Sequence, residues 1–163
     1  LMAQADRFYV ESMNFQGLAK RAQETKRDES SRCKRKSRFG KSIGDRAPAM
    51  FLNILKQKLE AQGGCLHKVN TTRFRASQYN HLADTYQKKT LSERWTLIGE
   101  DKIQRDLYSA FLLMNSNADG TSADRELCIK TYEDFKIKHD QLIERLKQSN
   151  EPLPKSFGLR KAA

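Results

Sequence analysis

The apolar positions of this chain follow strand-like and helix-like spacings that predict an order of elements. Residues 7–13 are rich in aromatic and β-branched side chains, which indicates a strand that carries Glu11 near its end. Residues 46–62 predict a helix. Pro48 suits its first turn, and Gly63 and Gly64 suit its end. The apolar residues between these limits keep a helical spacing: Phe51, Ile54, Leu55 and Leu59. Residues 65–69 predict a second strand. This order favours an α/β fold over residues 1–70.

The second half of the chain predicts an insert followed by two helices. No period is sustained over residues 71–104, so we expect an inserted, loop-rich subdomain with little hydrophobic core. Helical spacing returns in residues 105–118, and a second helix is expected within residues 119–150. Pro152 and Pro154 end that helix, and residues 151–163 are expected to form a disordered tail.

The charge balance changes this picture, because it suits a polyanionic partner. The chain carries 31 Lys and Arg against 20 Asp and Glu, a formal net charge of +11. Residues 20–41, here called the basic segment, mix cations with serines and predict contacts to phosphates, with a merely solubilising loop as the alternative. The candidate phosphate ligands there are Lys20, Arg21, Lys34, Arg35, Lys36, Arg38 and Lys41.

The insert combines cations with aromatic rings, as nucleic-acid-binding surfaces do. For Tyr79 and Trp95 an equally good interpretation is structural, since aromatic side chains can hold a small insert together. The candidate contacts are Arg73, Arg75, Tyr79, Lys88, Lys89, Arg94, Trp95 and the adjacent Arg105.

The cysteines and histidines do not predict a metal site of nitrogen and sulfur ligands. Cys33, Cys65 and Cys128 are scattered, as are the three histidines, so we expect no zinc and no disulfide framework. A reducing cytoplasm fits this usage. No run of about 18 apolar residues suggests a membrane span. We therefore expect a cytoplasmic, nucleic-acid-associated protein.

Two carboxylates stand where a metal ligand is plausible. Asp106 begins an apolar helical stretch, where it either complements the helix dipole or holds a divalent cation. Glu11 ends a strand, where it is either a surface charge or a second ligand. The pattern alone leaves both interpretations open.

The order of these pieces resembles a known family. The strings "FYVESMNFQGLAKR", "FGKSIGDRAPAMF", "ASQYN", "KKTLSERW" and "QRDLYSAFL" together resemble the C-terminal half of TnpB, the OrfB-type proteins of bacterial insertion sequences, which are kin to type V CRISPR effectors. The resemblance covers residues 7–116. It implies a RuvC-like nuclease of RNase H-like fold, with Glu11 and Asp106 as second and third carboxylate ligands of Mg²⁺ or Mn²⁺.

The chain departs from the family pattern at three places. The first-motif Asp has no match, so we expect the chain to be the C-terminal portion of a longer protein and inactive alone. The four cysteines of the family's zinc ribbon are absent, with Asn80 and Ala83 at the first pair and residues 96–99 at the second. Tyr108 stands where many members carry Asn.

The resemblance implies an RNA-guided DNA endonuclease whose partners are a guide RNA, target DNA and the remaining N-terminal part of the protein. The alternative is a nuclease-inactive, RNA-guided DNA-binding protein of the same family. A generic basic structural or membrane-surface protein would explain the charge but not the order of the motifs.

Overall fold

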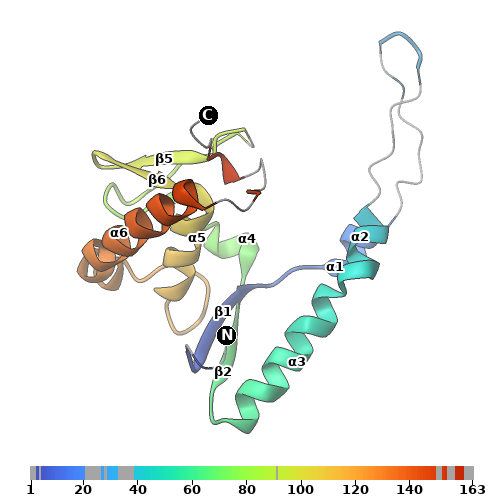
Figure 1. Ribbon diagram of the computed structural model, residues 1–163, viewed down its shortest axis with the longest axis horizontal. Helices are drawn as coiled ribbons and strands as arrows, with labels where there is room; N and C mark the ends of the chain where they lie inside the picture. The colour runs from blue at the N-terminus through green and yellow to red at the C-terminus, as the bar shows by residue number, and fades with distance from the viewer. Residues whose placement is uncertain are drawn as a thin grey trace. The chain divides into compact units, whose positions relative to one another are not determined.

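The computed structural model describes residues 3, 5–20, 27, 29–32, 39–90, 92–149, 152–153 and 157–159. Helices and short two-stranded sheets occur together, which confirms a mixed α/β composition (Figure 1). The chain forms two compact units. Unit 1 comprises Leu1–Phe8 and Ser12–Leu66, and unit 2 comprises Tyr9–Glu11 and His67–Ala163.

Unit 1 is built mainly from helices. Its described elements are α1 (Phe15–Ala19), α2 (Phe39–Arg46) and α3 (Pro48–Ala61). Ala47 separates α2 from α3 with a left-handed backbone (φ 41°), because the ring of a following proline disfavours the right-handed helical region. The helix predicted over residues 46–62 is thus confirmed, with its start shifted to Pro48. Only Leu55 and Leu59 of α3 are buried.

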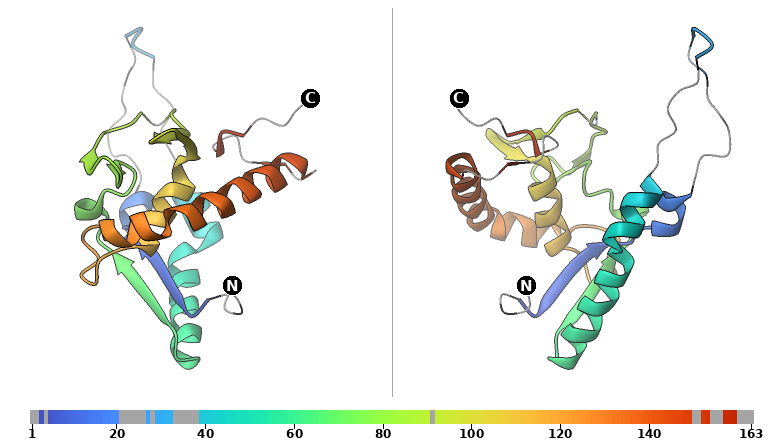
Figure 2. Two further views of the ribbon diagram at one scale, coloured as in Figure 1. Left: turned by 90° about the vertical axis from the view of Figure 1, so that its left-hand side faces the viewer. Right: turned by 45° about the vertical axis from the view of Figure 1, so that its right-hand side comes forward.

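The two strands that flank these helices pair with each other. They are β1 (Arg7–Glu11) and β2 (Cys65–Val69), and their arrows lie side by side and point the same way (Figure 2). The Cys65 N–H donates to the Asp6 carbonyl at 2.8 Å. A Cβ on Gly64 would lie 2.4 Å from that carbonyl oxygen, so only glycine allows the chain to begin β2 here.

Unit 2 contains two hairpins and two long helices. After α4 (Thr71–Phe74), the first hairpin joins β3 (Tyr79–Asn80) to β4 (Thr85–Tyr86), and the second joins β5 (Trp95–Ile98) to β6 (Asp101–Gln104). The helices are α5 (Arg105–Met114) and α6 (Arg125–Gln148), which pack against each other. Both predicted helices are present, although α5 ends at Met114, before the predicted bound at residue 118.

The main core of unit 2 includes the insert. Its buried members are Val69, Phe74, Ala76, Tyr79, Ile98, Ile103, Tyr108, Phe111, Leu112, Cys128 and Tyr132. The expectation of an insert with little core is therefore wrong. Each strand of the insert is too short to show a hydrophobic period, but the hairpins bring Phe74, Tyr79 and Ile98 against residues of α5 and α6.

A histidine lies at the centre of this core. His81 is 0% exposed, and its backbone N–H donates to the Tyr108 hydroxyl at 3.1 Å. The same hydroxyl is hydrogen-bonded to His81 Nδ1 at 2.8 Å. Nε2 has no hydrogen-bond partner among the described residues and lies among the rings of Phe111 and Tyr132. Burial, and the nearby Arg125 cation, lower the pKa of His81 to about 4.

This low pKa predicts a loss of stability in mild acid. The unfolded chain binds a proton at His81 near pH 6.5, whereas the folded chain binds it only near pH 4. Neutral His81 therefore contributes about 3 kcal/mol to the unfolding free energy above pH 6.5. This contribution is lost as the pH falls from 6.5 toward 4. Urea unfolding at pH 7.0 and 4.5 measures it.

Substitution at His81 separates this contribution from general acid denaturation. We expect His81→Gln to lower stability at pH 7.0 but to reduce the difference between the two pH values. An equal pH difference in the wild type and in His81→Gln contradicts the assignment.

Candidate metal and nucleic-acid site

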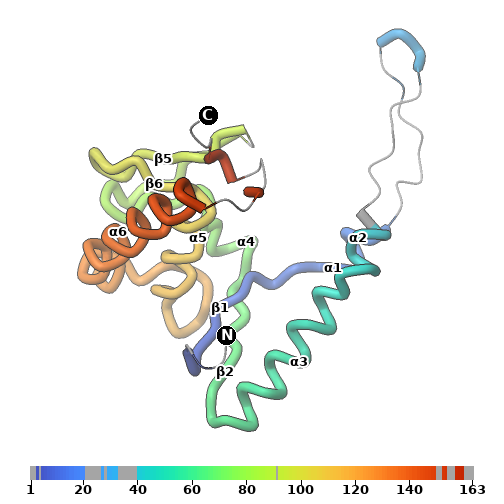
Figure 3. The backbone as a smooth tube through the Cα atoms, viewed as in Figure 1, coloured from blue at the N-terminus to red at the C-terminus, as the bar shows by residue number. Residues whose placement is uncertain are grey.

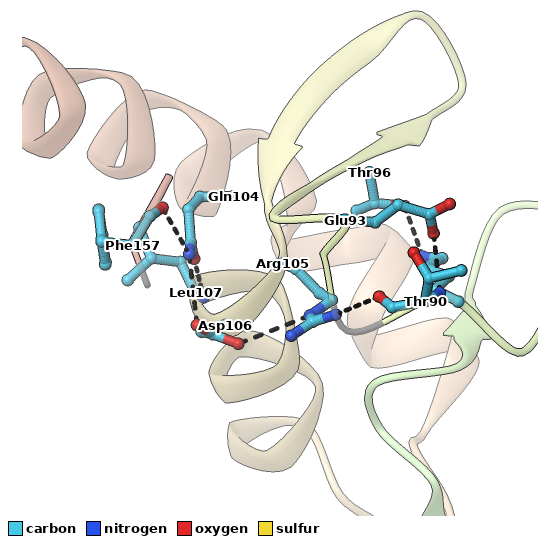
Figure 4. Close-up of polar contacts among 9 residues, drawn as sticks. Thr90, Glu93, Thr96, Gln104, Arg105, Asp106, Leu107 and Phe157 are labelled. Atoms are coloured by element: carbon cyan, nitrogen blue, oxygen red, sulfur yellow. Dashed lines mark hydrogen bonds and ion pairs between the residues drawn. The ribbon is translucent and has the colours of Figure 1, made fainter. Parts of the chain in front are cut away.

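Asp106 lies in the first turn of α5, directly after β6 (Figure 4). It does not cap the helix, because the Gln104 side chain occupies that role and accepts the Leu107 N–H at 2.8 Å. Among the described residues, the Asp106 carboxylate makes two contacts, both long: 3.4 Å to Gln104 Nε2 and 3.7 Å to Arg105 Nε. Its side chain is 59% exposed. The carboxylate is therefore available to a ligand.

Gln104 is the residue that sets the surroundings of Asp106. It is 0% exposed, although glutamine is usually a surface residue. Its backbone N–H donates to His139 Nε2 on α6 at 3.0 Å. Its side-chain amide donates to Asp106 and, at 3.3 Å, to the carbonyl of Phe157. Gln104 thus connects β6, α5, α6 and the C-terminal segment at one point.

Glu11 is the last residue of β1 and is half-buried. Within the part of the chain that the structure describes, its carboxylate makes no hydrogen bond or ion pair. No interaction among these residues links Glu11 to Asp106, so the structure does not join the two predicted ligands directly.

The donors present suit a hard divalent cation but do not complete a site for one. Two carboxylates with few partners are the oxygen ligands that Mg²⁺ prefers. The described residues contain no group of three or more His, Cys, Asp or Glu side chains placed to hold a metal. Glu11 and Asp106 could thus supply part of a ligand set, to which a further carboxylate must be added.

The insert keeps its turns by hydrogen bonds. The Asn80 side-chain oxygen accepts the backbone N–H groups of Leu82, at 3.0 Å, and Ala83, at 3.3 Å. At the other hairpin, the left-handed Gly99 turn approaches Leu82, because a Cβ on Gly99 would lie 3.3 Å from Leu82 Cδ1. The Asn80 turn and the Gly99 turn are therefore neighbours, with contact at Leu82. Arg125 also donates to the His81 and Leu82 carbonyls.

The predicted nucleic-acid contacts fall into three groups. Lys20, Lys41, Arg73, Arg75 and Lys88 are exposed, and Arg75 also lies 4.5 Å from the centre of the Tyr86 ring. Lys89, Arg94, Trp95 and Arg105 are partly buried; Lys89 donates to Thr96, and Arg105 donates to the Thr90 carbonyl. Arg21, Lys34, Lys36, Arg35 and Arg38 lie outside the described residues.

Tyr79 does not belong to an exposed stacking surface. Its side chain is only 5% exposed, its hydroxyl donates to Asp84 at 2.8 Å, and its ring packs on Tyr86. A base could stack on this ring only if the ring left the core, so its burial favours the structural interpretation of Tyr79. Tyr86 is the exposed ring of this pair, at 42%.

Sequence reasoning missed Gln104, His81 and the docked C-terminal residues. Glutamine is not among the common N-cap residues, so Gln104 carried no signal. Residues 157–159 lie in the predicted disordered tail, yet two of their carbonyls accept hydrogen bonds, from Gln104 and Trp95. Backbone acceptors leave no sequence signature.

Comparisons with protein-family profiles, curated proteins and solved structures gave no match to this chain. Among the described residues, no helix combines the length and apolar character needed to cross a membrane.

The Asn80 turn predicts a fold that does not require zinc. Asn80→Ala removes the acceptor of two backbone N–H groups and should lower the unfolding free energy by about 1–2 kcal/mol. Asn80→Asp keeps an oxygen acceptor and should recover most of this loss. We expect EDTA to leave the urea midpoint of all three proteins unchanged. A midpoint that falls on chelation contradicts a zinc-free insert.

Proposed function

We propose that this chain is the C-terminal, RuvC-like nuclease portion of an RNA-guided DNA endonuclease similar to TnpB and type V CRISPR effectors. The observation that carries the proposal is the string "QRDLYSAFL", whose aspartate lies at a strand-to-helix junction with an exposed, weakly engaged carboxylate. The order of the other motifs supports it. Capping does not explain Asp106, since the Gln104 side chain already caps α5.

In this proposal Glu11 and Asp106 bind the metal through their carboxylate oxygens, and an aspartate upstream of this chain supplies the third ligand. When bound, Mg²⁺ or Mn²⁺ activates water and stabilises the leaving oxygen in phosphodiester hydrolysis. Gln104 and Arg105 orient the Asp106 carboxylate from both sides. Arg105 is itself held by the Thr90 carbonyl, so its guanidinium has a fixed position.

The exposed cations have a separate role in this proposal. Arg73, Arg75 and Lys88 come from the insert, and Lys20 and Lys41 border the basic segment. Such residues contact phosphates and position a nucleic acid without reading its sequence. Base pairing with a guide RNA would select the target, and these side chains would hold RNA, DNA or the heteroduplex by the backbone.

The test is DNA cleavage by the longer protein that carries this chain, purified with its co-expressed RNA. We expect Mg²⁺-dependent cutting that Asp106→Ala and Glu11→Gln each reduce by more than about 100-fold, because even groups that only support a metal ligand cost 10–100-fold when removed. Asp134→Asn on α6 is the matched control, since it removes an exposed carboxylate and should leave the rate unchanged.

The outcomes separate the two candidate activities. Cutting that persists in Asp106→Ala contradicts the assignment of this residue as a ligand. RNA-dependent binding of target DNA with no cutting by any of the proteins would identify a guided binder, and Asp106 would then be a helix-start charge.

A further inference from the structure

The C-terminal residues 157–159 return to the junction between β6 and α5 (Figure 3). We call these three residues the strap. The Trp95 indole N–H donates to the Gly158 carbonyl at 3.0 Å, and the Gln104 amide donates to the Phe157 carbonyl at 3.3 Å. Trp95 and Gln104 are register partners in the β5–β6 hairpin. The strap therefore docks on one pair of facing residues through two successive carbonyl groups.

The strap position depends on a glycine. Gly158 has a left-handed backbone (φ +77°), and a Cβ there would lie 2.5 Å from Arg94 Cβ and 2.9 Å from Arg94 Cγ. A Cβ 2.5 Å from another Cβ, close to the main chain, cannot be accommodated by rotation of a flexible side-chain end. The strap can thus approach Arg94 and Trp95 this closely only because residue 158 has no side chain.

The strap is connected to Asp106 through the side chain of Gln104. The buried Gln104 amide has one oxygen, which caps α5, and one nitrogen, which is shared between Phe157 and Asp106. Because the cap fixes the oxygen and the strap holds the nitrogen, the amide has one orientation in which its remaining N–H faces Asp106 Oδ2. The strap does not cover Asp106, whose side chain is 59% exposed.

We propose that the strap is a positioning element of the nuclease site, which fixes the amide of Gln104 and thereby orients the Asp106 carboxylate for metal binding. This inference rests on the proposed function, because it takes Asp106 as a metal ligand. It assigns Gln104 as a positioning residue and gives the C-terminal segment a defined task. It also predicts that removal of the strap weakens the site, whereas a segment that blocked the site would activate it when removed.

Trp95 allows strap docking to be measured without any activity. It is the only tryptophan of the 163-residue chain, and its indole N–H donates to the strap. Gly158→Ala, and a truncation after Ser149, should each shift its fluorescence to longer wavelength as water replaces the strap. Gly63→Ala is the matched control, because Gly63 also has a left-handed backbone (φ +75°) but no atom within 4 Å of a Cβ. Emission that is unchanged in Gly158→Ala and in the truncation overturns the docking.

Two measurements then report metal binding. The first is Tb³⁺ luminescence sensitised by Trp95, measured on this chain. The second is the Mg²⁺ concentration that gives half-maximal cleavage, measured on the guided complex. We expect Gly158→Ala to weaken Tb³⁺ binding and to raise the Mg²⁺ half-saturation by about tenfold, with the rate at saturating Mg²⁺ changed less than about twofold. Gly63→Ala should match the wild type in both.

Three results overturn the positioning role. An unchanged Mg²⁺ half-saturation with a shifted Trp95 emission shows that the strap only covers the tryptophan. Faster cleavage in Gly158→Ala shows that the strap inhibits. Metal binding that is equal in the wild type and in Asp106→Ala shows that Asp106 is not a metal ligand. In that case the proposed function has failed. The fluorescence result for strap docking still holds.

Discussion

The shared hydroxyl of Tyr108 is the interaction on which the rest of unit 2 depends. It accepts the backbone N–H of His81 and is hydrogen-bonded to Nδ1 of the same residue, so one side chain of α5 binds two polar groups of the insert. Both partners are almost completely buried, and in such surroundings an unsatisfied polar group costs about 1–3 kcal/mol. Arg125 of α6 then holds the carbonyls of the same turn. Three segments that are distant in the sequence are thereby fixed at one place.

This arrangement also explains how Asp106 keeps a defined position on an exposed helix end. The first turn of α5 is held from inside by the Gln104 cap and from the insert by Arg105, which reaches the Thr90 carbonyl. Neither contact uses the Asp106 carboxylate as its main partner. Buried groups thus hold the backbone of the junction, while the Asp106 side chain is largely exposed. The proposed role of Asp106 as a ligand would use this support, because a binding site needs its ligand residues held in place by their surroundings.

The fold was predictable from the sequence where the determining signals are local. Pro48 and Gly63 bound α3 within one or two residues of the expected ends, and the apolar spacing after Asp106 predicted the start of α5, although that helix ends before residue 118. The core role of Phe74, Tyr79 and Ile98 was not predictable, because strands of two to four residues show no period and their burial comes from helices far along the chain. The strap was hidden for another reason. Its contacts use main-chain carbonyls, which every residue has, and only the glycine at position 158 is specific to it.

The Asn80 turn has a consequence for how this part of unit 2 can open. Its side-chain oxygen accepts the N–H groups of Leu82 and Ala83, while Arg125, at the start of α6, binds the carbonyls of His81 and Leu82. Leu82 also lies beside Gly99 of the other hairpin. Because the turn is held from within by Asn80 and from outside by α6, it cannot unfold without breaking its contacts to that helix. The turn and the start of α6 therefore form one cooperative unit of local unfolding.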